Sequence, residues 1–269
     1  MKVAIVGSGI SGNTIAHLLH KKHTISLYEK DSRIGGHSHT HNLYIDGNSV
    51  FVDTGFIVFN KKTYPLFLAL LEELGVEYEN SNMSFSVFSK ISGLEYNGTS
   101  LNTLFSQRKN LFNYKFIKMI FEILRFNKES LRILEAQEEL TLGEYLRDNR
   151  YSDYFSKHYI LPMGSAIWSS NLEGMMKFPA KFFISFLHNH GMLKVNDRPQ
   201  WLTIRNGSQS YVEKLCQPYK QAIKLNSNIK RIERKPNEII IYDQDGKKSF
   251  DYLFMACHSD EAMNLLSDL

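Results

Sequence analysis

The chain has 269 residues, of which 43% are hydrophobic and 22% are charged, and its formal net charge is +4. This composition is typical of a globular protein and excludes an intrinsically disordered chain. The excess of positive charge is small and dispersed, so we predict no nucleic-acid partner. No apolar stretch reaches the roughly 20 residues of a membrane-spanning helix. Cys216 and Cys257 lack metal-ligand spacing, so we expect reduced thiols in a cytoplasmic protein and no metal site.

The first elements of the chain are predicted to be a strand, a glycine turn, a helix and a second strand. Apolar runs at residues 3–6 and 25–28 flank an amphipathic stretch, and the second run ends in Glu29. The turn consists of Gly7, Ser8, Gly9, Ile10, Ser11 and Gly12. Its glycines permit, in order, a sharp turn, close approach of the backbone to a pyrophosphate, and packing of helix on strand. The helix N-terminus attracts phosphate and Glu29 can bind an adenosine ribose, so the segment predicts a dinucleotide site.

The residues after Glu29 distinguish one dinucleotide from another. After Lys30 and the next few residues come Gly35 and Gly36, whose missing side chains would let a flavin and its ribityl chain lie against the backbone. A nicotinamide dehydrogenase needs no such segment. His37 and Thr40 follow, and residues 52–55 read VDTG, in which Thr54 and Gly55 can turn N–H groups toward a cofactor. These residues favour a flavin.

Together, the glycine turn, Glu29, RIGGHSHT and VDTG resemble the FAD-binding fingerprint of the flavin amine oxidase and phytoene desaturase superfamily. FVDTGFIVFNKKTYP, LPMGSAIWSS, DRPQW and MACHSDEA resemble its branch of predicted NAD/FAD-binding, amine-oxidase-like proteins. This branch also occurs as the N-terminal part of plant cyclopropane-fatty-acid synthases. The resemblance covers essentially all 269 residues. It implies FAD as cofactor, held by the glycine turn, Glu29, Lys30, Gly35, Gly36, His37, Thr40, Thr54 and Gly55, with Ile229 against the adenine.

The middle of the chain is predicted to be largely helical. Residues 66–75 form a helix that stops at Gly75, alternation at 83–88 predicts a strand, and residues 93–98 a turn. Residues 110–140 show helical periodicity, and Thr141 with Glu144 forms a capping box for another helix. We therefore expect residues 76–202 to be a substrate domain of largely helical α+β structure.

Strands return near the end of the chain, at residues 229–232, 238–242 and 251–256, with a turn at 245–246. We expect the last strand to rejoin the parallel sheet. The predicted fold is α/β: a Rossmann-like, glutathione-reductase-like FAD-binding domain of residues 1–75 and 203–269, with a parallel sheet and a β-meander. The resemblance implies a further C-terminal region that this chain lacks, either because the sequence is a fragment or because another chain supplies that region.

Several residues carry alternative interpretations. His37, His39 and His41 would share one side of an extended segment, but ligands almost 7 Å apart in a row are poorly placed for a metal. His37 lies beside the flavin or phosphate, or in a solvated loop. Asp53 is a turn residue or lies near the flavin. Arg198 and Arg205 clamp an anionic substrate or form salt bridges, and no catalytic base can be named.

The function expected from the resemblance is FAD-dependent oxidation, with hydride transfer from a C–H or C–N substrate, an amine or a lipid, to flavin N5. Two alternatives stay open: an NAD(P)-dependent reductase, and a catalytically incomplete flavin-binding remnant or partner subunit. In residues 108–132 basic residues interleave with Phe112, Phe116, Phe121 and Phe126. This pattern indicates either a weak membrane-surface contact or a solvated helix packed on its own core.

Overall fold

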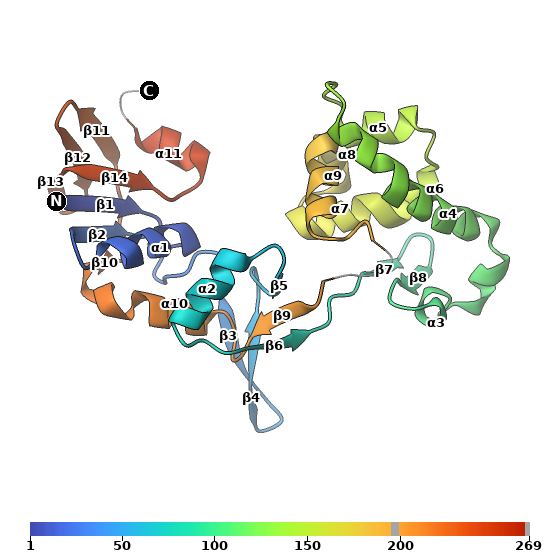
Figure 1. Ribbon diagram of the computed structural model, residues 1–269, viewed down its shortest axis with the longest axis horizontal. Coiled ribbons are helices and arrows are strands. Elements are labelled where there is room, and N and C mark those ends of the chain that lie inside the picture. The colour runs from blue at the N-terminus through green and yellow to red at the C-terminus, as the bar shows by residue number, and fades with distance from the viewer. Residues whose placement is uncertain (195–198, 267–269) are drawn as a thin grey trace. The chain divides into compact units, whose positions relative to one another are not determined.

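The computed structural model describes residues 1–194 and 199–266, which form two compact units (Figure 1). The first unit contains residues 1–59 and 64–81 and the chain from Leu202 onward, and the second contains residues 60–63 and 82–201. Both ends of the chain therefore belong to the same unit. Its first part extends to residue 81, beyond the expected boundary at 75, because a strand at Tyr78–Ser81 pairs within it.

A four-stranded parallel sheet forms the centre of the first unit. Its strands are β1 (Lys2–Val6), β2 (Thr24–Tyr28), β10 (Ile223–Lys224) and β14 (Tyr252–Met255). The order is β10-β2-β1-β14, and each neighbouring pair is parallel. The prediction that the last strand rejoins the parallel sheet is confirmed, and the structure places that strand beside the first.

The two faces of this sheet are covered by different kinds of structure. Val3 and Ile5 of β1 pack with helices α1 and α10, whereas Ala4 and Val6 pack with a three-stranded antiparallel meander. These elements are α1 (Ile10–Leu19), α10 (Gln209–Cys216), β11 (Arg231–Lys235), β12 (Glu238–Asp243) and β13 (Gly246–Phe250). Successive side chains of a strand point to opposite faces, so a continuous apolar run is what a sheet buried on both sides requires. The predicted α/β architecture with its meander is confirmed.

The remaining elements of the first unit extend from this three-layer core. A hairpin, β3 and β4, follows the second strand, and β5, β9 and β6 form a three-stranded sheet in that order. Helices α2, η4 and α11 complete the unit. The bounds are β3 (Thr40–Ile45), β4 (Asn48–Asp53), β5 (Phe59–Asn60), α2 (Pro65–Glu73), β6 (Tyr78–Ser81), β9 (Trp201–Ile204), η4 (Gln217–Ala222) and α11 (Ser259–Leu265).

The second unit is largely helical and has its own aromatic core, in which Phe116, Phe126, Phe155 and Phe183 are fully buried. One hairpin, β7 and β8, precedes the helices. The bounds are β7 (Ser86–Ser89), β8 (Leu94–Asn97), α3 (Leu101–Leu104), η1 (Arg108–Phe112), α4 (Tyr114–Glu129), η2 (Ser130–Leu134), α5 (Leu142–Asp148), α6 (Asp153–Phe155), η3 (Ser156–Ile160), α7 (Leu161–Trp168), α8 (Leu172–Met176) and α9 (Ala180–Asn189).

Local predictions for the second unit are confirmed at one place and wrong at another. Thr141 caps α5, accepting a hydrogen bond from the backbone N–H of Glu144, whose carboxylate accepts from the N–H of Thr141, as predicted. The turn expected at residues 93–98 is instead strand β8, because Leu94 and Tyr96 alternate into the core and pair with β7. Among the described residues no helix is both long and apolar enough to cross a bilayer.

Candidate cofactor-binding site

A cavity of about 950 Å³ opens in the first unit where its parallel strands end. The glycine turn follows β1, Glu29 follows β2, and Ala256, Cys257 and His258 follow β14. All of these residues except Gly12, the last of the turn, line the cavity. Carboxyl ends of parallel strands meet at one edge of a sheet, which is where open α/β folds bind ligands. The volume is at the upper end of the usual ~300–1,000 Å³ range of small-molecule pockets.

The three glycines of the turn have different surroundings. A Cβ on Gly7 would lie 2.5 Å from the Ala256 carbonyl oxygen, and one on Gly12 would lie 1.9 Å from the Gly7 oxygen. A Cβ on Gly9 would meet nothing within 4 Å. Gly9 is also the N-cap residue of α1, and no side chain caps this helix. Packing therefore explains Gly7 and Gly12, whereas Gly9 leaves free space beside the uncapped helix N-terminus.

Glu29 is buried at the end of β2 and holds a defined set of hydrogen bonds. The backbone N–H and hydroxyl of Ser8 donate to its Oε2 at 2.8 and 2.6 Å, and the N–H of Asp31 donates to Oε1 at 2.9 Å. A carboxylate can accept about four hydrogen bonds. Glu29 therefore keeps the capacity to accept another from a ligand hydroxyl.

The segment of Gly35 and Gly36 packs directly on the glycine turn. The N–H of Gly35 donates to the Ser8 carbonyl oxygen at 2.9 Å, and a Cβ on Gly36 would lie 2.9 Å from the Cα of Gly9. Both glycines have positive φ, of 109° and 59°. Because the two segments pack this closely, His37, which directly follows Gly36, lies beside the glycine turn and lines the cavity.

The three histidines expected to share one side of an extended segment do not do so. The strand β3 begins only at Thr40, so His37 lies in the loop before it, with its ring stacked on that of His258 at a centroid distance of 6.1 Å. The rings of His39 and His41 instead contact each other, with 4.1 Å between their centroids. Within the described part of the chain, no group of three metal-ligating side chains is placed to hold a metal ion.

Thr40, Thr54, Gly55 and Gly12 do not line the cavity. A Cβ on Gly55 would lie 2.3 Å from the His37 carbonyl oxygen, and the N–H of Thr54 donates to His39, so both residues support the loop that carries His37. Thr40 donates to Asp53 at 2.6 Å. These predicted residues therefore lie behind the cavity wall.

Asp53 connects the end of β4 to the loop before α10. Besides Thr40, the backbone N–H and the hydroxyl of buried Ser208 donate to its carboxylate at 2.9 and 2.8 Å. Asp53 does not line the cavity. Of the two interpretations of Asp53, the geometry supports the structural one.

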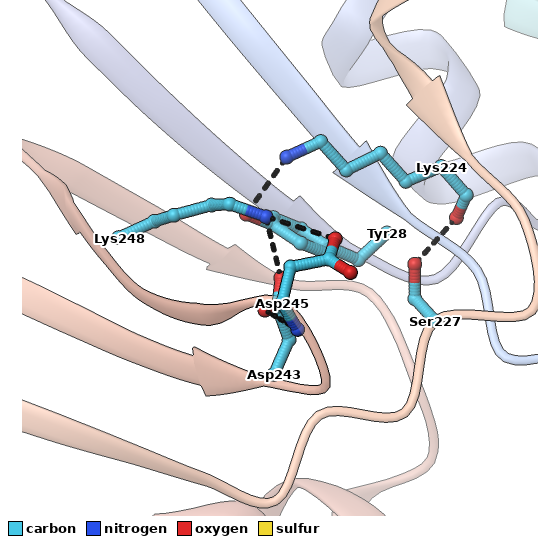
Figure 2. A network of polar contacts seen from close by, with 6 residues as sticks. All are labelled: Tyr28, Lys224, Ser227, Asp243, Asp245 and Lys248. Atoms are coloured by element: carbon cyan, nitrogen blue, oxygen red, sulfur yellow. Dashed lines mark hydrogen bonds and ion pairs between the residues drawn. The ribbon is translucent and has the colours of Figure 1, made fainter.

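Ile229 lines the cavity together with Ser227 and Asn228, on the segment that follows β10. The N–H of Ser227 donates to the Glu29 carbonyl oxygen at 2.8 Å, and the Ser227 hydroxyl donates to the carbonyl of Lys224 at 2.7 Å. These bonds hold the Ile229 segment against the end of β2, as Figure 2 shows for Ser227 and Lys224.

A polar network adjoins this segment (Figure 2). Lys224 Nζ donates to the Tyr28 hydroxyl at 3.3 Å, and Lys248 Nζ lies 2.9 Å from Asp243 and 3.3 Å from Asp245. Burial raises the pKa of Tyr28 to about 12, so its hydroxyl stays protonated. Tyr28 and Lys224 belong to β2 and β10 of the sheet and the other three residues to the meander, and the charge of Lys248 acts on Tyr28 across the two layers.

At another part of its wall the cavity is aromatic. Phe56, Tyr64, Phe67 and Tyr211 line it. The hydroxyls of Ser38 and Tyr211 share a hydrogen bond of 2.6 Å, and the Phe67 ring meets that of Tyr211 edge to face at 5.2 Å. This wall can contact a planar apolar group.

Sequence reasoning missed the contribution of the segment after β14. His258, Glu261, Asn264 and Leu265 line the cavity, and Glu261 forms an ion pair with Lys30. This ion pair raises the pKa of Lys30 and lowers that of Glu261. The signal was present, because the segment follows a strand expected to rejoin the parallel sheet and begins within the motif MACHSDEA.

The two arginines proposed as an anion clamp have different outcomes. Arg205 forms ion pairs with Glu77 at 2.5 Å and Glu79 at 3.4 Å. Of its two interpretations, the geometry therefore supports the salt bridge and not the anion clamp. Arg198, in the DRPQW motif, lies outside the described residues.

Residues 11–268 match a family model described as flavin containing amine oxidoreductase. The chain belongs to this family. FAD is accordingly its cofactor. The NAD(P)-dependent alternative, which the glycine turn alone had left open, is therefore not favoured. A comparison with the curated proteins gave no match.

Solved structures share the fold of this flavin amine oxidoreductase chain. A putrescine oxidase variant from a redesign of cofactor binding matches 98% of it, with a TM-score of 0.72 and 15% identity. Cyclohexylamine oxidase from Brevibacterium oxydans IH-35A matches 98%, with a TM-score of 0.70 and 15% identity. A CLA-producing fatty acid isomerase from P. acnes matches 99%, with a TM-score of 0.66 and 15% identity. The chain covers 59%, 59% and 61% of these three proteins, or about three fifths of their length.

Proposed function

We propose that the first unit binds FAD in the cavity and that the whole enzyme oxidises a small amine. The observation that supports this most is the convergence of three separate segments on one cavity: the glycine turn, Glu29, and the loop of Gly35, Gly36 and His37. Each offers what one part of a dinucleotide requires. The free space at Gly9 and the uncapped N-terminus of α1 suit the pyrophosphate.

The other parts of the cofactor have matching partners in this proposal. The remaining acceptor capacity of Glu29 suits a ribose hydroxyl, and Ile229 on its fixed segment suits the adenine. His37 and His258 can donate hydrogen bonds to phosphate or flavin oxygens. The aromatic wall suits the isoalloxazine. Thr40, Thr54 and Gly55 would act indirectly, by supporting the loop of His37.

Bound FAD would supply the chemistry, which is acceptance of a hydride at N5 from a C–H bond of the substrate. The residues of this chain would bind and orient the cofactor and exclude water from its apolar side. None of the described residues is assigned as a catalytic base.

Support for the substrate class comes from the family description and from two of the structural neighbours, whose names state putrescine and cyclohexylamine as substrates. The neighbouring fatty acid isomerase supports a lipid as the second class. A small primary amine is therefore the first substrate to test, and an unsaturated fatty acid the second. A further chain segment, in this polypeptide or another, would complete the fold of the longer neighbours.

The direct experiment is a visible absorbance spectrum of the purified chain before and after addition of FAD, followed by gel filtration. We expect flavin bands that elute with the protein. Gly9→Ala should raise the Kd for FAD about tenfold or more, equivalent to ~1.4 kcal/mol, because the methyl group occupies the free space beside the helix N-terminus. The free energy of unfolding of Gly9→Ala should not fall, because the added Cβ meets no atom within 4 Å.

Gly98→Ala is the matched control, because its added Cβ would make only an ordinary contact, 3.7 Å from the Phe85 oxygen, in the other unit. Equal FAD affinity of Gly9→Ala and Gly98→Ala would contradict the proposed pyrophosphate position. A folded chain that takes up no FAD would instead support the alternative of an incomplete remnant or partner subunit.

A further inference from the structure

Residues 108–132, which include helix α4 of the second unit, contain an excess of basic side chains. Seven residues of this segment are Lys or Arg and two are Glu. One of the two acids, Glu122, is buried and accepts hydrogen bonds from the backbone N–H and hydroxyl of Ser152 at 2.8 and 2.5 Å. The Glu122 carboxylate is therefore turned into the unit and does not offset the basic side chains at the surface. The charge that the segment presents to solvent is strongly positive.

The aromatic residues of this segment divide between the two sides of the helix. Phe116 and Phe126 are fully buried in the core of the second unit, so this part of the segment is a helix packed on its own core, one of the two interpretations of the sequence. Phe121 is 67% exposed and Phe112, just before the N-cap Asn113, is 92% exposed. Large apolar side chains at the end of η1 and on α4 therefore remain exposed to solvent. Figure 1 shows α4 in green.

The exposed residues follow a helical period. Tyr114, Lys118, Phe121 and Lys128 are separated by three to seven residues and lie on one face of α4, opposite the buried Phe116 and Phe126. Tyr114 is 77% exposed. Leu111 and Leu124 add two half-exposed aliphatic side chains to the same region. A helix whose outer face only meets water needs no large apolar side chains there. The combination of basic and apolar side chains therefore favours a binding surface.

The exposed lysines of α4 have no anionic partner in the described parts of the protein. Lys118 and Lys128 lie on the outer face, and Lys115 lies about 100° from Tyr114 around the helix, in its first turn. Lys115, Lys118 and Lys128 are all exposed, and none of them forms an ion pair with another residue of the described ranges. Arg125 differs, because its guanidinium lies 4.1 Å over the Tyr151 ring and donates to the Asn149 carbonyl. Three cations are thus free to meet an external anion.

We infer that the outer face of α4 docks on an anionic lipid surface. Charge complementarity supports this occupant, because phosphate headgroups would meet the three lysines while Phe112, Tyr114 and Phe121 enter the boundary between headgroups and acyl chains. A helix of 16 residues is about 24 Å long, enough to lie in the plane of the interface. The exposed aliphatic residues Leu111 and Leu124 favour lipid over nucleic acid, because they cannot stack on bases.

The inference is independent of the flavin proposal and can be tested with or without FAD. The full chain is sedimented with vesicles of phosphatidylcholine alone and with vesicles that also contain phosphatidylglycerol. We expect binding only to the anionic vesicles, and we expect added salt to weaken it. The triple variant Lys115→Glu, Lys118→Glu, Lys128→Glu should reduce the partition coefficient by about tenfold or more, since each basic residue contributes to surface attraction.

The matched control is Lys21→Glu, Lys22→Glu, Lys220→Glu, which makes the same charge change at exposed lysines of the first unit and should retain binding. Phe112→Ser with Phe121→Ser should also lose vesicle binding while the charge stays the same. This second variant keeps the test decisive if the triple variant does not fold.

Three results would overturn the inference. The first is equal binding to neutral and anionic vesicles, or to neither. The second is binding to a single-stranded RNA homopolymer without binding to vesicles, which would indicate nucleic acid. The third is a shift from dimer to monomer on replacing the phenylalanines, without vesicle binding, which would indicate that a second copy of the chain covers this face.

Discussion

At the scale of single residues, Asp53 shows how a residue of a cofactor-like motif can serve the fold. Its carboxylate accepts hydrogen bonds from three donors, the hydroxyl of Thr40 and the hydroxyl and N–H of buried Ser208, at 2.6–3.0 Å, and the N–H reaches both oxygens. Asp53→Asn replaces one acceptor oxygen with a donor that faces the Ser208 N–H. We expect the free energy of unfolding to fall by about 2 kcal/mol, the usual contribution of hydrogen bonds to a charged group.

Chemical denaturation measures this change, and Asp46→Asn is the control. Asp46 has a positive φ of 49° in an exposed hairpin turn, a conformation that asparagine adopts readily. Its replacement should leave stability unchanged. Equal effects of the two substitutions would mean that the Asp53 contacts contribute little.

The two cysteines give a residue-scale test of the cavity itself. Cys257 lines it and is half-buried, whereas Cys216 is buried and its Sγ lies 3.1 Å from the Asn13 side-chain oxygen. Burial raises the pKa of Cys216 to about 11, so almost no thiolate exists at neutral pH. Iodoacetamide should therefore modify Cys257 first, and FAD should slow that reaction severalfold. Mass spectrometry identifies the modified site, and labelling of Cys257 at the same rate with FAD would place the cofactor elsewhere.

At the scale of elements, the network between sheet and meander predicts a pH effect. Burial alone would raise the pKa of Asp243, but hydrogen bonds from Lys248 and the Asp245 N–H and the nearby lysine charges outweigh it and hold the pKa below its ordinary value. A depressed pKa in the folded state stabilises the protein above the unfolded pKa of about 3.9, and this contribution is lost as pH falls through the folded value.

Asp243→Asn should therefore lower the free energy of unfolding at pH 7 by about 2 kcal/mol, and the difference from the unmodified protein should shrink below about pH 4. Urea denaturation at a series of pH values measures both. Asp245→Asn is the control, because its carboxylate is 65% exposed and should contribute less to the same lysine. A difference that stays constant down to pH 2 would show that the charge of Asp243 is not involved.

Sequence periodicity was sufficient for elements whose signal is local. The apolar run at Val3–Val6, the capping box of Thr141 and the stop at Gly75, which has a φ of 61°, all determine structure through near neighbours. The segment at Leu94 was misread because two flanking glycines resemble a turn, whereas pairing with β7 decides its structure. The sequence did not predict that His37 is separated from His39 and His41, because the conformation of its loop depends on packing against Gly9 and Gly55.

At the scale of the whole molecule, the family and its cofactor were predictable because the residues that carry them form contiguous motifs. The cavity as a whole was less predictable. Its wall combines the segment after β2 with Ser227, Asn228 and His258, which lie some 200 residues farther along the chain. Only the parallel order β10-β2-β1-β14 brings these parts together. Sequence distance therefore hid Ser227 and Asn228, which lie in none of the motifs, and the motif MACHSDEA did not by itself show that His258 reaches the cavity.

The pairing of β1 with β14 has a consequence for synthesis on the ribosome. Val3 pairs with Tyr252 and Val6 with Met255, so the nascent chain must emerge past Met255 before the central sheet can close. The second unit, from residue 82 to 201, emerges earlier and can form its aromatic core while β1 and β2 still lack their neighbours. Loop closure over this distance is slow, and the apolar edge of β1 stays exposed in the interval. During translation this chain would therefore depend on chaperones most in its first, N-terminal strands.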